Sequence, residues 1–297
     1  MVVAFFLCGV LYAQDMTHST AEAVHQPAGT LYQFALAAPA QAQDLTSCVK
    51  GDKASYLGGV SNVRARCDPS AGTPCVDLAR LFVRAQAEYL TVLDNATMSL
   101  GADTDFTWAE WAYFADTADV RLMFGKGGAT TNLSEYYCWV GDTERFDCFL
   151  GNGASSASII SGVLAVPGWH FFAFRHDAAN NLIRLRADAT DSVAVAWAGG
   201  TQDTADNFSI GRHSLVGTGY YDGRLSNFGL WKVHLSDAQV TTLAAGVLYE
   251  DLPGGFPAPT EWFELAEVSG DATGKVVGVV LTDTNTVGSA TGPGICP

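Results

Sequence analysis

Charged side chains are scarce in this sequence, and basic ones are the scarcest. Asp, Glu, Lys and Arg make up 16% of the 297 residues, against roughly 25% in an average soluble domain. The 31 acidic residues outnumber the 16 basic ones and give a formal net charge of −15. This balance repels phosphates, so nucleic acid and anionic membranes are excluded as partners. Neutral glycans and divalent cations stay open, as does the simpler interpretation that the charge only keeps the surface soluble.

The apolar stretch that opens the chain is not long. MVVAFFLCGVLYA at residues 1–13 is too short to span a bilayer, which needs about 20 residues. It lacks a basic n-region, and Leu11 is a poor residue for position −3 of a cleavage after Ala13. We interpret residues 2–13 as a buried strand, with an uncleaved leader as the alternative. A second signal-like stretch has a better cleavage site at Ala42, so we treat residues 1–43 as a separate N-terminal segment.

The sequence contains no C-x-x-C pair, which argues against a zinc ribbon. Its seven cysteines favour disulfides in an oxidising, extracellular setting. Cys138 and Cys148 flank a strand–turn–strand pattern centred on Thr143, and facing residues on paired strands have Cβ atoms about 4.5–5.5 Å apart. We predict a disulfide there and a second between Cys67 and Cys75, with buried free thiols as the alternative for each pair. Three cysteines, an odd number, are then left: Cys8, Cys48 and Cys296.

Strand patterns dominate the rest of the chain. HFFAFRHD and NLIRLRAD are separated by AAN, a pattern that predicts a β-hairpin. Strands at roughly 8–12-residue spacing, with few helical periods, indicate a sandwich or barrel. In the second strand of this hairpin we expect three residues to point inward, namely Ile183, Leu185 and Ala187, and three outward, namely Arg184, Arg186 and Asp188.

Residues 220–243, YYDGRLSNFGLWKVHLSDAQVTTL, predict a strand followed by a short helix. The apolar alternation slips by one residue, which suggests a β-bulge at Ser226 and Asn227. Ser236 and Gln239 then have the spacing of a capping box. We therefore expect a kinked strand and a short helix that begins near Asp237.

This stretch resembles the closing signature of concanavalin A-like, laminin-G-like jelly rolls, the superfamily that includes pentraxins. AEYLTVLDNATMSLGADTDFTWAEWAYF at 87–114, RLMFGKGG and GWHFFAFRHDAANNLIRLRAD resemble earlier motifs of the same family in the same order. The resemblance covers about residues 80–246. It implies an all-β, two-sheet antiparallel jelly-roll sandwich with one short helix, and we assign it residues 44–250. Four aromatic residues should fill the core between its sheets: Phe106, Trp108, Trp111 and Phe114.

Some members of this superfamily are glycoside hydrolases, which the motifs here do not favour. Laminarinase-type enzymes need an E-x-D-x-x-E run that places two carboxyl groups about 5–5.5 Å apart. The stretch WAEWAYFAD offers only Glu110, and the sequence lacks G-x-S-x-G, H-E-x-x-H and Walker-type motifs. We therefore predict no catalytic residues and no enzymatic activity, and keep a hydrolase as a minor alternative.

Calcium is the usual cofactor that the resemblance implies, but the pentraxin-type ligands do not match. Leu133 and Ser134 stand where pentraxins have an Asp-Asn pair. GRHSLVG stands near the position where pentraxins have their second cluster of calcium ligands. These groups do not suit a cation that wants 6–8 oxygens. We expect no cofactor. Asp103 and Asp105 are weak candidates for a different calcium site, with turn and capping carboxylates as the alternative.

Glycans are the other ligand class that the resemblance implies. Tyr220 and Tyr221 lie beside glycines in GTGYYDG, with Arg212 and His213 close in sequence. We predict these four residues as ligand-binding positions. The alternative interpretation places one tyrosine in the core and the other at the rim.

Residues 251–297 form a C-terminal extension that resembles the opening of a second module. We expect its strands to pack on a neighbouring subunit or on an outer face of the sandwich. Similar modules are frequent in bacteriophage structural proteins and bacterial surface proteins. The leading hypothesis is therefore a non-catalytic structural or adhesive module of a virion or cell-surface assembly, with other subunits as partners in a homo- or hetero-oligomer. The alternative is a secreted, lectin-like carbohydrate-binding protein.

Overall fold

The computed structural model forms two compact units, of which Leu78–Pro293 is the larger. In the smaller unit, β1 (Val2–Leu7) pairs antiparallel with β2 (Val10–Asp15), so the strand predicted over residues 2–13 is a hairpin. Some of the predictions fall outside the described residues. These are the disulfide between Cys67 and Cys75, the three cysteines Cys8, Cys48 and Cys296, and the domain boundary at residue 43. The structure describes residues 2–7, 10–15, 78–114, 120–128, 130–141, 143–164, 167–212, 219–247, 249–267, 269–285 and 287–291.

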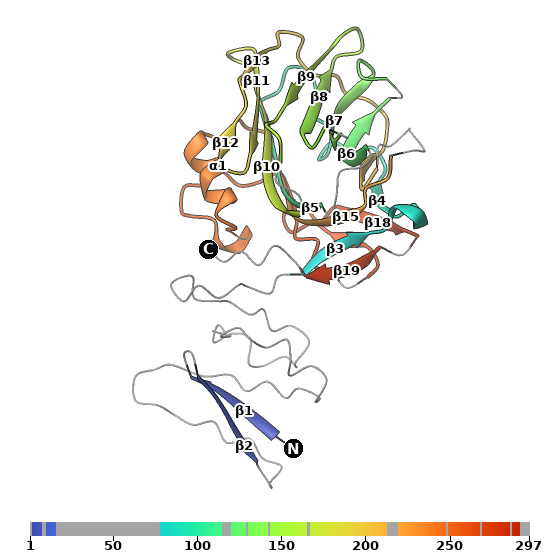
Figure 1. Ribbon diagram of the computed structural model, residues 1–297. Coiled ribbons are helices and arrows are strands. Elements are labelled where there is room, and N and C mark those ends of the chain that lie inside the picture. Colours follow the sequence, from blue (N-terminus) through green and yellow to red (C-terminus); the bar gives the residue numbers. More distant parts are fainter. Residues whose placement is uncertain are drawn as a thin grey trace. The chain divides into compact units, whose positions relative to one another are not determined.

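The larger unit is a sandwich of two antiparallel sheets, as predicted (Figure 1). The nine-stranded sheet has the order β12-β11-β10-β5-β15-β3-β19, with β13 paired to β11 and β16 paired to β15. Its strands are β3 (Leu78–Phe82), β5 (Phe106–Phe114), β10 (Gly168–Asp177), β11 (Leu182–Ala187), β12 (Thr190–Asp191), β13 (Val195–Ala196), β15 (Gly223–Trp231), β16 (Glu261–Phe263) and β19 (Gly288–Thr291).

The eight-stranded sheet has the order β17-β18-β4-β14-β6-β7-β8-β9. Two short 3-10 helices, η4 (Arg84–Gln86) and η5 (Tyr249–Asp251), and one α-helix, α1 (Asp237–Ala244), complete the described part of this unit. The strands of this sheet are β4 (Tyr89–Val92), β6 (Arg121–Gly127), β7 (Ser134–Val140), β8 (Phe146–Gly151), β9 (Ser156–Ile160), β14 (Phe208–Ile210), β17 (Ala272–Thr273) and β18 (Val280–Thr284).

The core between the sheets is rich in aromatic rings. Phe106, Trp108 and Phe114 on β5 are fully buried in it, as predicted. Trp111 is not part of this core, because side chains alternate between the two faces of a strand and residue 111 has the opposite parity. It instead packs on Phe171, with ring centroids 5.4 Å apart, on the face that α1 covers. The prediction for Trp111 is therefore wrong.

The kinked strand and the helix are confirmed. The register between β15 and β5 shifts between Ser226 and Gly229, and Asn227 has φ of 53°. The side chain of Ser236 caps α1, and that of Gln239 completes the capping box. Figure 1 shows α1 on the outer side of the nine-stranded sheet, where Val240 is buried.

The prediction that the C-terminal extension packs on a neighbour or on an outer face is wrong. β16 pairs with β15, β18 with β4 and β19 with β3, and Figure 1 shows the red C-terminal strands beside the cyan strands that open the sandwich. Phe263 and Leu281 are buried in the main core. The extension therefore completes both sheets of its own sandwich. Its strands pair with edges of β15, β4 and β3 that would otherwise expose unpaired backbone groups.

Two buried charged groups hold this extension in place. The guanidinium of Arg80 donates to the carbonyl oxygens of Glu267 and Gly270 and lies 3.6 Å from a carboxylate oxygen of Asp283. The carboxylate of Glu261 accepts backbone hydrogen bonds from Val276 and Val279, each at 2.9 Å. The turn between β17 and β18 is thus built around an internal anion.

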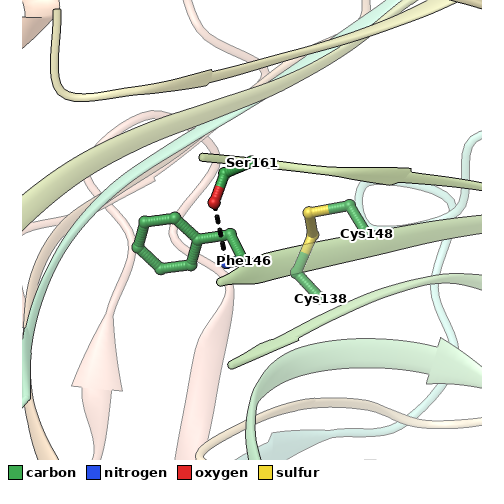
Figure 2. Close-up of a disulfide and its surroundings, with 4 residues drawn as sticks. All are labelled: Cys138, Phe146, Cys148 and Ser161. Atoms are coloured by element: carbon green, nitrogen blue, oxygen red, sulfur yellow. Dashed lines mark hydrogen bonds between the residues drawn. A yellow bond between two sulfur atoms is a disulfide. The ribbon is translucent and has the colours of Figure 1, made fainter. Parts of the chain in front are cut away.

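The predicted disulfide between Cys138 and Cys148 is present (Figure 2). The two residues are direct partners on β7 and β8, so the turn centres on Thr143 as predicted. Both are fully buried in the core. Beside them the backbone N–H of Phe146 donates to the hydroxyl of Ser161 at 2.9 Å, which ties β8 to the end of β9.

Candidate functional site

The outer face of the eight-stranded sheet carries an unusual set of side chains. On β7, Tyr136, Cys138 and Val140 point into the core. Side chains alternate along a strand, so Tyr137 and Trp139 point to the opposite, outer face. The register places Phe149 of β8 opposite Tyr137 and Asp147 opposite Trp139.

Tyr137, Trp139 and Phe149 form an aromatic triad on this face. The rings of Tyr137 and Phe149 stack with centroids 4.6 Å apart and an interplanar angle of 9°. Trp139 meets both edge-on, at 5.9 Å from Tyr137 and 5.5 Å from Phe149. Tyr137 is nearly covered, whereas Trp139 and Phe149 are half-buried and so present part of their rings to solvent.

Asp147 adds an acidic group beside this triad. Burial raises the pKa of its carboxyl to about 6, while a hydrogen bond from the Trp139 side chain acts in the opposite direction. On the next strand, β9, Asp147 faces Ile160, which is 48% exposed. One end of the sheet thus presents an indole, a carboxyl group and an aliphatic side chain in a row.

A second cluster lies on β4 and the chain that follows β14. The guanidinium of Arg212 lies 3.7 Å from the centroid of the Tyr89 ring, and the rings of Tyr89 and Tyr220 lie 6.2 Å apart. We call these three residues the rim cluster. The structure thus brings together Arg212 and Tyr220, two of the predicted ligand-binding residues, and adds Tyr89, which the sequence reasoning missed. His213 lies outside the described residues.

Tyr221 does not belong to this cluster. It is fully buried in the core, and its hydroxyl donates to the carbonyl oxygen of Tyr113 at 2.9 Å. The prediction that Tyr221 binds a ligand at the surface is therefore wrong. The alternative, with one tyrosine in the core and one at the rim, describes Tyr221 and Tyr220.

Small polar side chains lie between the rim cluster and the triad. The strand register links Thr282, Thr91 and Ser209 across β18, β4 and β14, and the hydroxyls of Thr91 and Ser209 are 3.0 Å apart. The same row continues through Gly125 to Tyr137. The outer face is therefore polar in its middle and aromatic toward β7 and β8.

The remaining acidic residues singled out in the sequence are Asp103, Asp105 and Glu110. Asp105 accepts a hydrogen bond at 2.8 Å from the backbone N–H of Ala178 in the turn between β10 and β11, and Asp103 is exposed in a turn. Glu110 is fully buried, neither of its carboxyl oxygens has a hydrogen-bond partner, and burial raises its pKa well above the usual range. Within the described residues, His, Cys, Asp and Glu side chains form no group of three or more that could hold a metal ion. In the same part of the chain, no helix is long and apolar enough to cross a membrane.

Comparison with known proteins identifies the fold. A family model described as the concanavalin A-like lectin/glucanases superfamily matches residues 85–241. A Bacteroides ovatus protein to which carbohydrate binding has been ascribed is similar in structure, with a TM-score of 0.55 and 14% identity over 73% of this chain. The match spans 60% of the length of that protein. No curated protein matches the sequence.

Two further structures are similar at a lower level. The heptameric SAP-like pentraxin of Limulus polyphemus gives a TM-score of 0.49 and 15% identity, covering 71% of this chain and 94% of the pentraxin. The CBM40 domain of a Ruminococcus gnavus IT-sialidase, bound to sialyllactose, gives 0.45 and 11% identity, covering 56% of this chain and 95% of that domain. Because the family model covers more than half of the sequence and its two-sheet sandwich is present, this chain belongs to the concanavalin A-like lectin/glucanases superfamily.

Proposed function

We propose that this chain binds carbohydrate on the outer face of its eight-stranded sheet. The observation that carries the proposal is the aromatic triad with Asp147 beside it. Aromatic rings that keep one side in solvent offer an apolar platform with defined geometry, and binding sites combine such platforms with a few well-placed polar groups. Trp139 and Phe149 provide the platform.

The far end of the same face supports an extended ligand. Thr282 is exposed and Thr91 half-buried on neighbouring strands about 4.8 Å apart, so both offer hydroxyl groups, whereas Ser209 next to Thr91 is fully buried. The rim cluster adds a second aromatic surface with a guanidinium at Tyr89. Glycan chains, which present both apolar ring faces and hydroxyl groups, match this alternation of aromatic and polar side chains.

We propose further that the chain is a binding protein and not a glucanase. Support comes from Glu110, the only Glu in the stretch where a laminarinase-type motif would lie, because the core encloses its carboxyl group. Binding should also need no calcium, since Asp105 is engaged by the β10–β11 turn. The buried disulfide favours an oxidising, extracellular location.

A structural or adhesive role in a virion or cell-surface assembly stays as the second proposal. It rests on the motifs that resemble those of bacteriophage and bacterial surface proteins. Its other support was a C-terminal extension free to join a neighbour, and that support is lost because β16, β18 and β19 lie in their own sandwich.

A glycan array probed with the full chain tests the proposal. We expect saturable binding to at least one oligosaccharide, equal in calcium chloride and in EDTA. Trp139→Ala should lose it, whereas Trp169→Ala, which removes a half-buried indole from the other sheet, should retain it. An array with no saturable signal would reject carbohydrate binding and leave the structural role. Equal loss in both variants would move the site away from the triad.

A further inference from the structure

The carboxyl group of Asp147 is placed to control the indole of Trp139. The two residues face each other on β8 and β7, and hydrogen bonding from the Trp139 side chain lowers the pKa of the carboxyl group, against the larger effect of burial. The other carboxyl oxygen, Oδ1, is buried and has no hydrogen-bond partner. The indole therefore provides the hydrogen bond that Asp147 receives among the described residues, and the strength of that bond depends on the charge of Asp147.

The groups around Asp147 leave its charge uncompensated. Strand β7 faces it with Tyr137 and Trp139, and strand β9 faces it with Ile160. Tyr137 is neutral at physiological pH, and burial and the Asp147 charge raise its pKa still further. Arg145, two residues earlier in the chain, is exposed. Burial among uncharged groups disfavours the carboxylate and brings its titration toward neutral pH.

We propose that Asp147 positions the ring of Trp139 and thereby makes glycan affinity depend on pH, an inference that rests on the proposed function of this face. In the ionised state a charge-assisted hydrogen bond, roughly twice as strong as a neutral one, fixes the indole as a platform. In the protonated state that bond weakens and the ring loses its fixed orientation. Affinity is therefore high when Asp147 is ionised and falls when it takes up a proton.

The expected pH window follows from the pKa of about 6. One unit below its pKa, a carboxyl group is only about one-tenth ionised. If only the ionised form holds the platform, apparent affinity at pH 5 should approach a tenfold loss relative to neutral pH. A ligand that prefers the ionised form also lowers the pKa of Asp147 in the complex, so the midpoint should shift to lower pH when glycan is bound.

The first experiment needs no glycan. In ¹⁵N-labelled full chain, the indole N–H resonance of Trp139, assigned by its loss in Trp139→Phe, is followed from pH 4.5 to pH 8. We expect its chemical shift to titrate with a midpoint near 6. In Asp147→Asn, which keeps an oxygen acceptor and cannot ionise, the resonance should stay constant. A resonance that does not titrate in the wild type, or that titrates equally in Asp147→Asn, would overturn the inference.

The second experiment measures affinity for the soluble form of the best array ligand at pH 5 and pH 7.5. The wild type should bind more weakly at pH 5, and Asp147→Asn should bind equally at both. Equal affinity of the wild type at both values would overturn the pH dependence. An indole that titrates in a chain without any array ligand would support the contact between Asp147 and Trp139 while rejecting the proposed function, so the two failures are distinguishable.

Discussion

Lys126 and Glu135 form an ion pair between two fully buried side chains, with 2.8 Å between Nζ and Oε2. The ammonium also lies 3.0 Å from a carboxylate oxygen of Asp94 and donates to the carbonyl oxygen of Thr204. The carboxylate of Glu135 accepts the backbone N–H of Leu100. The pair thus ties two loops to β6 and β7 at one end of the sandwich.

Removing the cation of this pair should be costly. Lys126→Met leaves the Glu135 carboxyl buried without its partner, and breaking a buried pair in this way typically destabilises a protein by about 3–5 kcal/mol. Urea unfolding followed by circular dichroism measures the loss. The matched control is Lys275→Met, which breaks the partly exposed pair with Glu264 and should cost less than about 1 kcal/mol. Equal costs would show that burial of the Lys126 pair has no energetic weight.

Truncation tests the place of the C-terminal extension. A chain that ends at Gly255 loses β16, β17, β18 and β19 and, with them, core residues such as Phe263, Leu265 and Leu281. Because each large apolar side chain contributes about 1.5–3 kcal/mol by burial, the truncated chain should not fold. Its dispersion in a ¹H–¹⁵N spectrum should be that of an unfolded protein. A folded, monomeric product would instead restore the hypothesis that the extension serves assembly.

The disulfide should contribute measurably to stability. The bond closes a sequence separation of 10 residues, for which the chain-entropy relation gives about 2–3 kcal/mol. Cys138→Ala with Cys148→Ala should lower the urea midpoint accordingly, and the slope of the transition should not fall, because the unfolded chain without the bond is no more compact. Peptide mapping of the wild type without reductant should recover β7 and β8 as one linked fragment. Separate peptides would contradict the bond.

Glu110 should make the wild type less stable as pH rises. Its folded-state pKa is raised well above the ordinary 4.5, so the folded chain keeps a proton that the unfolded chain releases above about that pH. The free energy of unfolding therefore falls as pH rises above 4.5, toward the raised pKa. Glu110→Met, which removes a buried group without partners, should raise stability at pH 7 by about 1–3 kcal/mol. Its unfolding free energy should lack this negative slope, as thermal melts from pH 4 to pH 8 would measure, and parallel curves for the two proteins would contradict the assignment.

Local patterns predicted the local structure. The spacing of Cys138 and Cys148 about Thr143 predicted a hairpin register that the structure has. The same register also predicts the candidate site. Residues that alternate with the core-facing cysteines must face outward, and in this register they pair as Tyr137–Phe149 and Trp139–Asp147. The site was missed because tyrosines beside glycines at a loop tip were preferred over a strand face. The same parity rule would have placed Trp111 outside the core.

Long-range pairing could not be predicted in this way. β18 pairs with β4 through Thr284 and Tyr89, and no turn between them sets the register. The apolar residues of the extension required burial, but they did not reveal which strand edge would provide it. The extension resembles an opening segment, which suggested a second module. In the structure its strands instead pair with the edges of β3 and β4 in the same sandwich.

The pairing of Leu81 with Gly288 also has a consequence for synthesis. Neither sheet is complete until the last strands have left the ribosome. At about 5–20 residues per second, the chain between these two partners takes roughly 10–40 s to translate. During that time the edges of β3 and β4 expose unpaired backbone groups to other nascent chains. The edges of β3 and β4 therefore stay open to the wrong partner until β18 and β19 have emerged and pair with them.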